Sequence, residues 1–296
     1  MTPRVVYIAG FGRSGSTFLD LLLGNHNEIF GCGELRNLFN LLGRDRATCA
    51  CGLRLRECSF WRGVWSDVRS EIGKGLTLEE ADAVTTAFDH LRRPGTRDPA
   101  AYASLWRATF GAIARRSGRD VLVDSSKTMR NAAWRPVELA RTADLDVRVI
   151  HLVRDPRAVV WSTMRWWWRI SDSSWSRRWG PDSPYGRALR GVGGWLTANL
   201  LVRRPDIVVR YEDLMAEPSR ELGRIGGAIG VDLTSLGELV EQGAVLEPGH
   251  GAGGNSRRRD DVITLKADRE WETSLPRFGR LIASAGRPLA RRYGYF

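Results

Sequence analysis

Short apolar runs alternate along the chain with longer stretches of helical periodicity. Four of these runs lack the polar alternation of a half-exposed strand and predict buried strands, at residues 4–9, 120–124, 147–153 and 206–210. Helical stretches are expected between and after them, among others at residues 79–92, 100–117 and 184–202. Continuous apolar strands that alternate with helices are typical of a parallel sheet covered on both faces. The pattern therefore predicts an α/β fold of three layers, with a central parallel sheet flanked by helices.

Polar or charged residues follow each predicted strand at its C-terminal end. In an open α/β sheet, ligands bind at this edge because the loops that leave the strands lie next to one another there. We therefore expect the loops after the four strands to form one site. His151 lies inside the third strand and is expected to be a satisfied core residue rather than a base.

The first predicted strand leads into a glycine-rich turn, Gly10 to Thr17 with the sequence GFGRSGST, and then into an apolar helix that includes Phe18. A strand, a glycine-rich turn and a helix start aim backbone N–H groups and a helix dipole at a phosphate. The spacing is that of a Walker A loop, but Ser16 stands where lysine is expected. The turn therefore predicts a phosphate site that does not favour ATP hydrolysis. Its nearest cation is Arg13, whose guanidinium can form two parallel hydrogen bonds to phosphate or sulfonate oxygens.

A second anion site is predicted where the third strand ends. Arg154 follows the strand, Pro156 suits the first position of a helix, and Ser162 lies two turns further on. The alternative for Arg154 is an ordinary ion pair with Asp155 or Asp124. Residues 243–260 are rich in glycine and include three consecutive arginines, so they predict a mobile loop over an anion.

The composition is that of an ordinary globular protein, because 296 residues with 43% hydrophobic content suffice for one large α/β domain or two small ones. We expect one domain over residues 1–296, with helical or tryptophan-rich insertions at about 25–118 and 160–200. The net charge of +11 at pH 7 comes from 45 basic and 34 acidic residues and favours anionic ligands. The charge alone does not separate a nucleotide, a nucleic acid and a membrane surface as partners.

We expect a cytoplasmic protein without stable membrane insertion. The glycine-rich turn begins by Gly10, which leaves no room for a signal peptide. No segment approaches the roughly 18 consecutive apolar residues of a membrane span.

The four cysteines lie in the first fifth of the chain, at Cys32, Cys49, Cys51 and Cys58. The spacing Cys49-x-Cys51-x6-Cys58 lacks the two-residue separation of common zinc knuckles. Reduced thiols without a metal are therefore expected, and zinc is the alternative that metal analysis would settle.

Residues 161–179 hold half of the chain's twelve tryptophans, interleaved with arginines. Indole rings suit sugar rings, aromatic groups or lipid edges, and the arginines suit an anionic partner. The alternative is that some of these rings are core. Because Trp166, Trp167 and Trp168 are consecutive, at least one of them is expected to be exposed at a partner surface or cleft.

Three elements together resemble the PAPS-dependent sulfotransferases: the Arg13-Ser14-Gly15-Ser16-Thr17 turn, the strand that leads into Arg154-Asp155-Pro156-Arg157 with Ser162 beyond it, and Arg210-Tyr211-Glu212-Asp213-Leu214. The resemblance runs from Val5 to about Trp271. It implies a P-loop-like fold in which Arg13, Ser14, Gly15, Ser16, Thr17 and Phe18 bind the 5′-phosphosulfate of 3′-phosphoadenosine 5′-phosphosulfate (PAPS). By the same resemblance Arg154 and Ser162 hold the 3′-phosphate, with Tyr211 at the nucleotide. The loop of Arg257, Arg258 and Arg259 is similar to the family's late basic loop, and Arg258 is the preferred contact.

The element Gly33-Glu34-Leu35-Arg36 resembles that of the protein-tyrosine sulfotransferase branch, which implies Glu34 as the base and Arg36 as a residue that positions the acceptor. The alternative is that Glu34 only opens a helix over residues 34–42, where a carboxylate favours the dipole. His250 is the competing base. Arg13 and Lys127 are the cations expected at the leaving oxygen, because sulfuryl transfer depends on positioning and cationic stabilisation. A monoanionic sulfonate needs no divalent metal.

The sequence therefore predicts a sulfotransferase that moves the sulfuryl group of PAPS to a hydroxyl of a small-molecule, glycan or lipid acceptor and releases PAP. A P-loop kinase is the alternative enzyme, which Ser16 and the lack of a clear magnesium ligand disfavour. A basic nucleic-acid-binding module that uses the tryptophans and arginines is the less favoured alternative, so no nucleic-acid partner is expected. The acceptor and the oligomeric state have no readable signal in the sequence.

Overall fold

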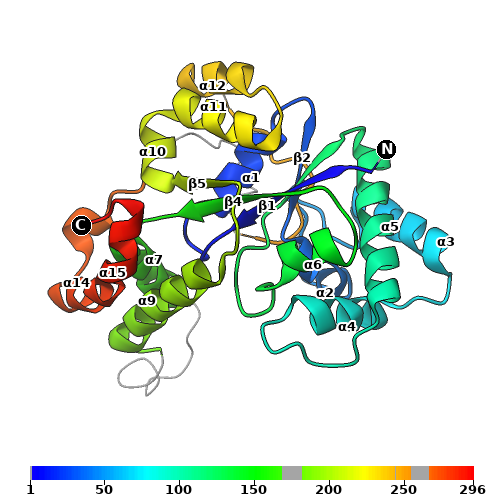
Figure 1. Ribbon diagram of the computed structural model, residues 1–296, viewed down its shortest axis with the longest axis horizontal. Helices are drawn as coiled ribbons and strands as arrows, with labels where there is room; N and C mark the ends of the chain where they lie inside the picture. The colour runs from blue at the N-terminus through cyan, green and yellow to red at the C-terminus, as the bar shows by residue number, and fades with distance from the viewer. Residues whose placement is uncertain (1, 169–181, 244, 255–266) are drawn as a thin grey trace.

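The computed structural model describes residues 2–168, 182–243, 245–254 and 267–296 (Figure 1). Within these residues five strands form one parallel sheet in the order β2-β3-β1-β4-β5. The strands are β1 (Arg4–Ala9), β2 (Ile29–Gly33), β3 (Val121–Asp124), β4 (Val147–Val153) and β5 (Ile207–Arg210). The four strands predicted from apolar runs are present within one residue of their expected bounds, and the predicted α/β layering is confirmed.

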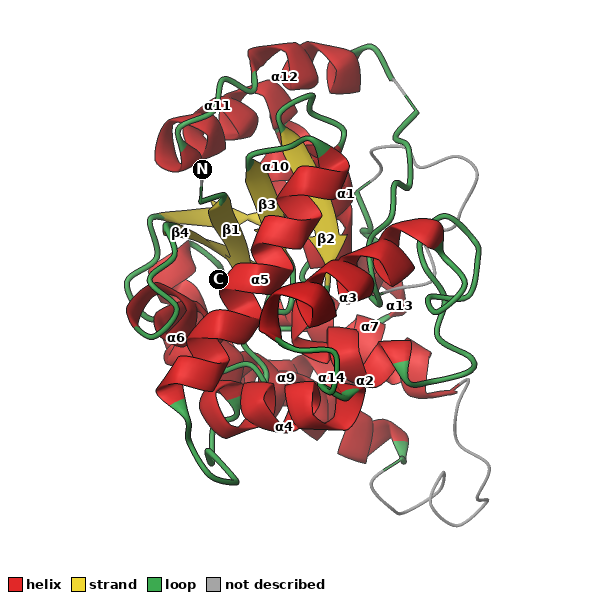
Figure 2. Cartoon of the chain, turned by 90° about the vertical axis from the view of Figure 1, so that its right-hand side faces the viewer, coloured by secondary structure: helices red, strands yellow, loops and turns green. Residues whose placement is uncertain are grey.

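Helices cover both faces of the sheet because alternate strand residues point to opposite layers. Val6 and Ile8 of β1 pack among α1 (Ser16–Gly24), α11 (Pro218–Ile229) and α12 (Thr234–Glu241). Val5 and Leu122 face the other layer. That layer contains α2 (Leu38–Leu42), α3 (Ser59–Ile72), α4 (Leu78–Asp89), α5 (Pro99–Ser117) and α6 (Arg135–Arg141) (Figures 1 and 2).

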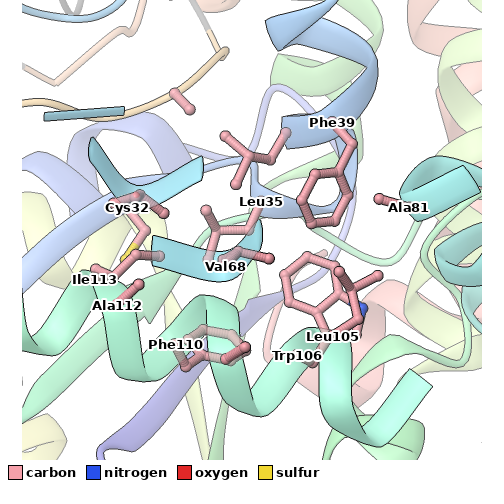
Figure 3. Packing of buried hydrophobic residues seen from close by; sticks show 14 of the residues in the cluster. Cys32, Leu35, Phe39, Val68, Ala81, Leu105, Trp106, Phe110, Ala112 and Ile113 are labelled. Carbon is pink, nitrogen blue, oxygen red and sulfur yellow. The ribbon is translucent and has the colours of Figure 1, made fainter. Parts of the chain in front are cut away.

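The core on this second face is strongly aromatic. The ring centroid of Trp106 on α5 lies 5.6 Å from that of Phe39 on α2 and 5.6 Å from that of Phe110 (Figure 3). The predicted helix at residues 100–117 corresponds to α5, where the Asp98 side chain accepts a hydrogen bond from Ala101 N–H and caps the first turn. The predicted helix at residues 79–92 corresponds to α4, which ends earlier because His90 is extended.

Strand β2 is the element that the apolar pattern missed. Its sequence Ile-Phe-Gly-Cys-Gly contains two glycines, which weaken any strand signal. Gly33 has φ +85°, and a Cβ there would lie 2.2 Å from the carbonyl oxygen of Ala252. The glycine is therefore required by the close approach of residues 250–252, which run beside the end of β2.

A further group of helices packs beyond the C-terminal ends of β1 and β4. Helix α7 (Pro156–Trp168) lies against α9 (Pro184–Leu201), and both contact α14 (Arg277–Ala283). Gly191 permits the α7–α9 approach, because a Cβ there would lie 3.2 Å from the Cα of Val160. The other elements are a 3₁₀ helix Leu35–Asn37, α10 (Tyr211–Ala216), α13 (Trp271–Ser274), a 3₁₀ helix Ser284–Gly286, α15 (Arg287–Ala290) and a 3₁₀ helix Arg291–Tyr293. No helix in the described ranges is both long and apolar enough to cross a membrane.

Candidate active site

The glycine-rich turn connects β1 to the N-terminus of α1, as its sequence predicts. Gly10 and Gly15 have φ of +119° and +94°, and Arg13 has φ +74°, a left-handed conformation that is uncommon for a residue with a side chain. A Cβ on Gly15 would lie 2.5 Å from the ring of Tyr211. The Ser14 hydroxyl is buried and has no hydrogen-bond partner among the described residues. The buried Ser14 hydroxyl therefore lies in the turn that leads directly into the N-terminus of α1.

The loop after β3 is fastened to the glycine-rich turn. Thr128 N–H donates to the Gly10 carbonyl oxygen at 2.8 Å, and Gly10 N–H donates to Thr128 Oγ1 at 3.1 Å. The Tyr7 hydroxyl donates to the Lys127 carbonyl oxygen, and burial raises the pKa of Tyr7, so this donor stays protonated. Lys127 has φ +66°. Two left-handed residues, Arg13 and Lys127, therefore lie at the same edge, as is common in functional sites.

Lys127 forms an ion pair with Glu34. The Lys127 ammonium donates to Glu34 Oε1, and both side chains are mostly buried. The Lys127 side chain also passes beside the glycine-rich turn, since a Cβ on Gly12 would lie 3.9 Å from Lys127 Cδ. Glu34 precedes the short 3₁₀ helix but makes no capping hydrogen bond from its side chain to the backbone. The carboxylate thus pairs with the lysine and does not cap the helix.

Arg36 lies two residues after Glu34, and its side chain is held by hydrogen bonds within the protein. Its side chain donates to the Asn131 carbonyl oxygen at 2.6 Å, to Asp82 Oδ1 at 3.1 Å and to Thr86 Oγ1 at 2.5 Å. Its backbone N–H donates to Ser126 Oγ at 2.9 Å. The side chain is almost fully buried. Arg36 therefore joins the segment of Glu34 to the loop of Lys127, and its role in positioning the acceptor stays a prediction.

A buried ionic chain that the sequence analysis missed lies behind this loop. The Arg135 guanidinium donates to Asp124 Oδ2 at 2.7 Å and to Asp89 Oδ2 at 2.8 Å, and all three side chains are fully buried. The guanidinium carbon lies 3.7 Å from the Trp106 ring centroid. Asp124 Oδ1 accepts a hydrogen bond from Ser126 N–H at 3.1 Å. The chain therefore fixes the start of the Lys127 loop.

Arg154 joins the loops after β1, β4 and β5. Its guanidinium donates to the Arg13 carbonyl oxygen at 3.1 Å, and it pairs with Asp268 Oδ2 at 3.3 Å. Its guanidinium carbon lies 4.5 Å from the ring centroid of Tyr211. Neither Asp155 nor Asp124 is its partner: Asp155 holds Arg157, and Asp124 holds Arg135. The predicted convergence of the strand-end loops is therefore confirmed, and Arg154 is not the ordinary ion pair offered as its alternative.

Some residues singled out in the sequence lie on α7, and others fall outside the described residues. Ser162 is half-buried on α7, with Trp161 beside it, and Arg165 follows one turn later. The Arg165 guanidinium carbon is 6.0 Å from the Trp161 ring centroid. The residues or side chains that the structure does not describe are Trp166, Trp167, Trp168, Trp175, Trp179, Arg257, Arg258 and Arg259.

The two histidines considered in the sequence have other partners. His151 Nε2 lies 2.8 Å from Asn199 Oδ1 in the core, so the expected satisfied core histidine is confirmed. His250 lies beside the cysteines, with Nδ1 3.4 Å from Cys58 Sγ and 3.8 Å from Cys49 Sγ. Its ring also stacks on Phe60, with centroids 5.2 Å apart. His250 is thus held beside the cysteines, whereas Glu34 pairs with Lys127 next to the glycine-rich turn.

The chain matches the family model described as Sulfotransferase family over residues 3–235. Among solved structures it resembles the sulfotransferase domain from the Synechococcus PCC 7002 olefin synthase, with a TM-score of 0.52 and 23% identity over 99% of this chain and 95% of that one. It also resembles the sulfotransferase domain from the curacin biosynthetic pathway, with a TM-score of 0.49 and 21% identity over 96% of this chain and 97% of that one. No curated protein matches the chain. Because the family model covers most of the chain, and the olefin synthase domain shares its fold, the protein belongs to the sulfotransferase family.

Proposed function

We propose that the protein transfers the sulfuryl group of PAPS to a hydroxyl of a small-molecule, glycan or lipid acceptor and releases PAP. The bond between sulfur and the bridging oxygen of the 5′-phosphate breaks while the bond to the acceptor oxygen forms. The acceptor proton passes to the Glu34 carboxylate, and the phosphate leaves with the bridging electron pair. Such an in-line displacement depends on alignment and on cations near the leaving oxygen.

The ion pair of Glu34 and Lys127 beside the glycine-rich turn carries this proposal. It places a proton acceptor and a cation side by side, next to the backbone that suits a phosphate. Lys127 neutralises charge on the bridging oxygen, and Glu34 accepts the proton of the attacking hydroxyl. The left-handed conformation of Lys127, held by Tyr7 and Thr128, keeps the ammonium at this point without a metal ion.

The nucleotide end of the proposal rests on buried donors. Arg154 has an Nε atom, and Ser14 a hydroxyl, that are buried and lack a hydrogen-bond partner among the described residues. Buried donors without partners are costly, so they favour an anionic ligand that would accept from them. We assign the 5′-phosphosulfate to the turn of Arg13 to Phe18. We assign the 3′-phosphate to Arg154 and Ser162, with Tyr211 beside the nucleotide and the triplet Arg257, Arg258 and Arg259 as further candidate contacts.

Turnover and binding test the proposal separately. The purified protein is incubated with PAPS and a panel of phenols, sugars and glycolipids, and PAP is quantified by chromatography. Glu34→Gln should lower turnover by about 10²–10⁴-fold, the usual contribution of a positioned base, while PAP still binds. Glu241→Gln, an exposed carboxylate at the end of α12, is the matched control and should leave turnover unchanged. Near-normal turnover of Glu34→Gln would remove Glu34 as the base.

Binding of PAP is measured by calorimetry. Arg154→Ala should weaken PAP by roughly tenfold or more, because hydrogen bonds to charged groups contribute about 1.5–3 kcal/mol each. Arg46→Ala, at an exposed loop position, should bind PAP as the unmodified protein does. If the unmodified protein does not bind PAP, PAPS is not the donor.

A further inference from the structure

We propose that Cys49, Cys51, Cys58 and His250 bind a structural zinc ion. The three sulfur atoms and a ring nitrogen of His250 lie within 4.8 Å of one another. This site is distinct from the proposed sulfuryl-transfer site and does not depend on the donor or the acceptor. It replaces the sequence expectation of metal-free thiols, which considered the cysteines without their fourth partner.

Three of the six ligand-to-ligand distances are close to those of a tetrahedral site. Zinc bonds of about 2.3 Å to sulfur and about 2.0–2.1 Å to nitrogen place two sulfurs about 3.8 Å apart, and a sulfur and a nitrogen about 3.6 Å apart. Cys51 Sγ and Cys58 Sγ are 3.8 Å apart, and His250 Nδ1 is 3.4 Å from Cys58 Sγ and 3.8 Å from Cys49 Sγ. A disulfide would need a sulfur–sulfur distance of about 2.05 Å. The Cys51 and Cys58 sulfur atoms are therefore too far apart for a disulfide, and their separation matches that of two ligands of one zinc ion.

The ligand set selects the metal. Three thiolates and one imidazole form a Cys₃His site, a common structural zinc set, and sulfur-rich tetrahedral sites favour zinc over magnesium or calcium. Four protein ligands leave no open position, so the ion is structural and does not contact the acceptor. Cys58 is the residue before the first turn of α3, so the start of that helix fixes the position of its backbone.

The surroundings hold the ligands in this arrangement. Cys49 and Cys51 lie in a tight turn, where Gly52 N–H donates to the Cys49 carbonyl oxygen at 3.1 Å and Gly52 has φ +88°. Trp61 Nε1 donates to the His250 carbonyl oxygen at 2.6 Å, and the Phe60 ring stacks on the imidazole within 7° of parallel. Both ring contacts come from the start of α3, the helix that Cys58 precedes. The histidine is therefore oriented toward the sulfurs by residues that are not ligands.

The ion would connect the cysteine loop to the segment beside Glu34. Ala50 N–H donates to the Gly251 carbonyl oxygen at 3.0 Å, so His250 and Gly251 already lie against this loop. Ala252 N–H donates to the Cys32 carbonyl oxygen at 2.8 Å, and Glu34 N–H donates to the Ala252 carbonyl oxygen at 2.7 Å. Fixing His250 thus fixes the backbone that holds Glu34. Glu34 would respond to the ion through this backbone and not through a direct contact.

Metal content of the intact protein tests the site directly. Protein purified without chelator is analysed by inductively coupled plasma mass spectrometry, and its zinc environment by X-ray absorption. We expect stoichiometric zinc, with a first shell of three sulfurs and one nitrogen. Folded protein that contains no zinc, takes up none on titration with zinc chloride, or shows an oxygen-rich shell would overturn the proposal. A loss of two mass units that marks a Cys51–Cys58 disulfide would overturn it as well.

Single substitutions distinguish ligands from neighbouring thiols. Cys51→Ser and His250→Ala should each weaken zinc at least about tenfold in competition with a chromogenic chelator. Cys32→Ala removes the one cysteine outside the cluster and should keep stoichiometric zinc. Equal zinc affinity in all three variants would overturn the assignment. Because Cys51 is partly exposed, its serine variant should fold, and circular dichroism verifies this.

Discussion

The ring of Tyr211 contacts both Gly15 and the Arg154 guanidinium, so that one aromatic side chain joins the end of β5 to the glycine-rich turn and to the end of β4. The guanidinium carbon is 4.5 Å from the ring centroid, and a Cβ on Gly15 would lie 2.5 Å from the ring. Burial raises the pKa of the Tyr211 hydroxyl, which therefore stays neutral beside the glycine-rich turn. The ring thus sets the separation of Gly15 from the start of α10.

Gly15→Ala should disrupt this separation. The added methyl group would meet the Tyr211 ring, and φ +94° is unfavourable for any residue with a Cβ. We expect PAP affinity to fall by at least about tenfold, since either the turn or the ring must move. Gly118→Ala is the matched control: Gly118 also has positive φ, but a Cβ there meets nothing within 4 Å and lies far along the chain from the turn. Calorimetry with PAP measures both variants, and equal affinity in both would contradict the spacer role of Tyr211.

Lys127→Met should lower turnover by about 10²–10³-fold, the usual cost of removing a group that stabilises developing charge. Lys74→Met is the matched control, because Lys74 is exposed on the loop between α3 and α4. The double variant Glu34→Gln with Lys127→Met should lose less activity than the product of the two single losses, since the two side chains form one ion pair. Fully multiplicative losses in steady-state kinetics would show that the two residues act independently.

Arg135→Met should lower the free energy of unfolding, because Arg135 is part of a buried ionic chain. It leaves the carboxylates of Asp124 and Asp89 buried without their common partner, and breaking a buried pair in this way typically costs about 3–5 kcal/mol. Arg115→Met is the matched control, since Arg115 is exposed and its pair with Glu71 is 3.4 Å long. Urea unfolding followed by fluorescence gives both free energies of unfolding. Similar values for the two variants would mean that the buried chain contributes little.

Most strands of the sheet, and the loops at its C-terminal edge, could be predicted from the sequence because both depend on local patterns. Apolar runs identified β1, β3, β4 and β5, and the residues directly after them, Arg154 and Tyr211 among them, could be placed by the rule for parallel sheets. Strand β2 could not be found in this way, since its two glycines serve contacts from elsewhere in the fold: Gly31 lies against Asp20 of α1, and Gly33 lies against Ala252 from the far end of the chain.

The missed side-chain partners share a physical cause. His250 joins cysteines that lie about two hundred residues earlier, and Arg135 joins Asp89 across α4 and α6, so neither pairing has a spacing that a motif could reveal. The partners of Arg36, Asp82 and Thr86, come from a helix whose position depends on the whole core, so the sequence does not reveal them either. The contacts that anchor the segment of Glu34 are tertiary, whereas the glycine-rich turn is a local feature of the sequence.

His151→Gln should reduce the dependence of stability on pH. Burial lowers the pKa of His151, and its Nε2–H donates to Asn199 Oδ1, whose amide nitrogen is held by the Trp195 carbonyl oxygen. Below the usual histidine pKa of about 6.5 the unfolded chain takes up a proton that the folded chain does not, so stability is lost as pH falls from this value toward the folded pKa. Glutamine can keep a donor to Asn199 but does not titrate. Urea unfolding between pH 7.5 and 5.5 should therefore give a smaller loss of stability in the variant, by up to about 1.4 kcal/mol per pH unit. Because other titrating groups are shared by both proteins, equal slopes would show that His151 has the same pKa in the folded and the unfolded chain.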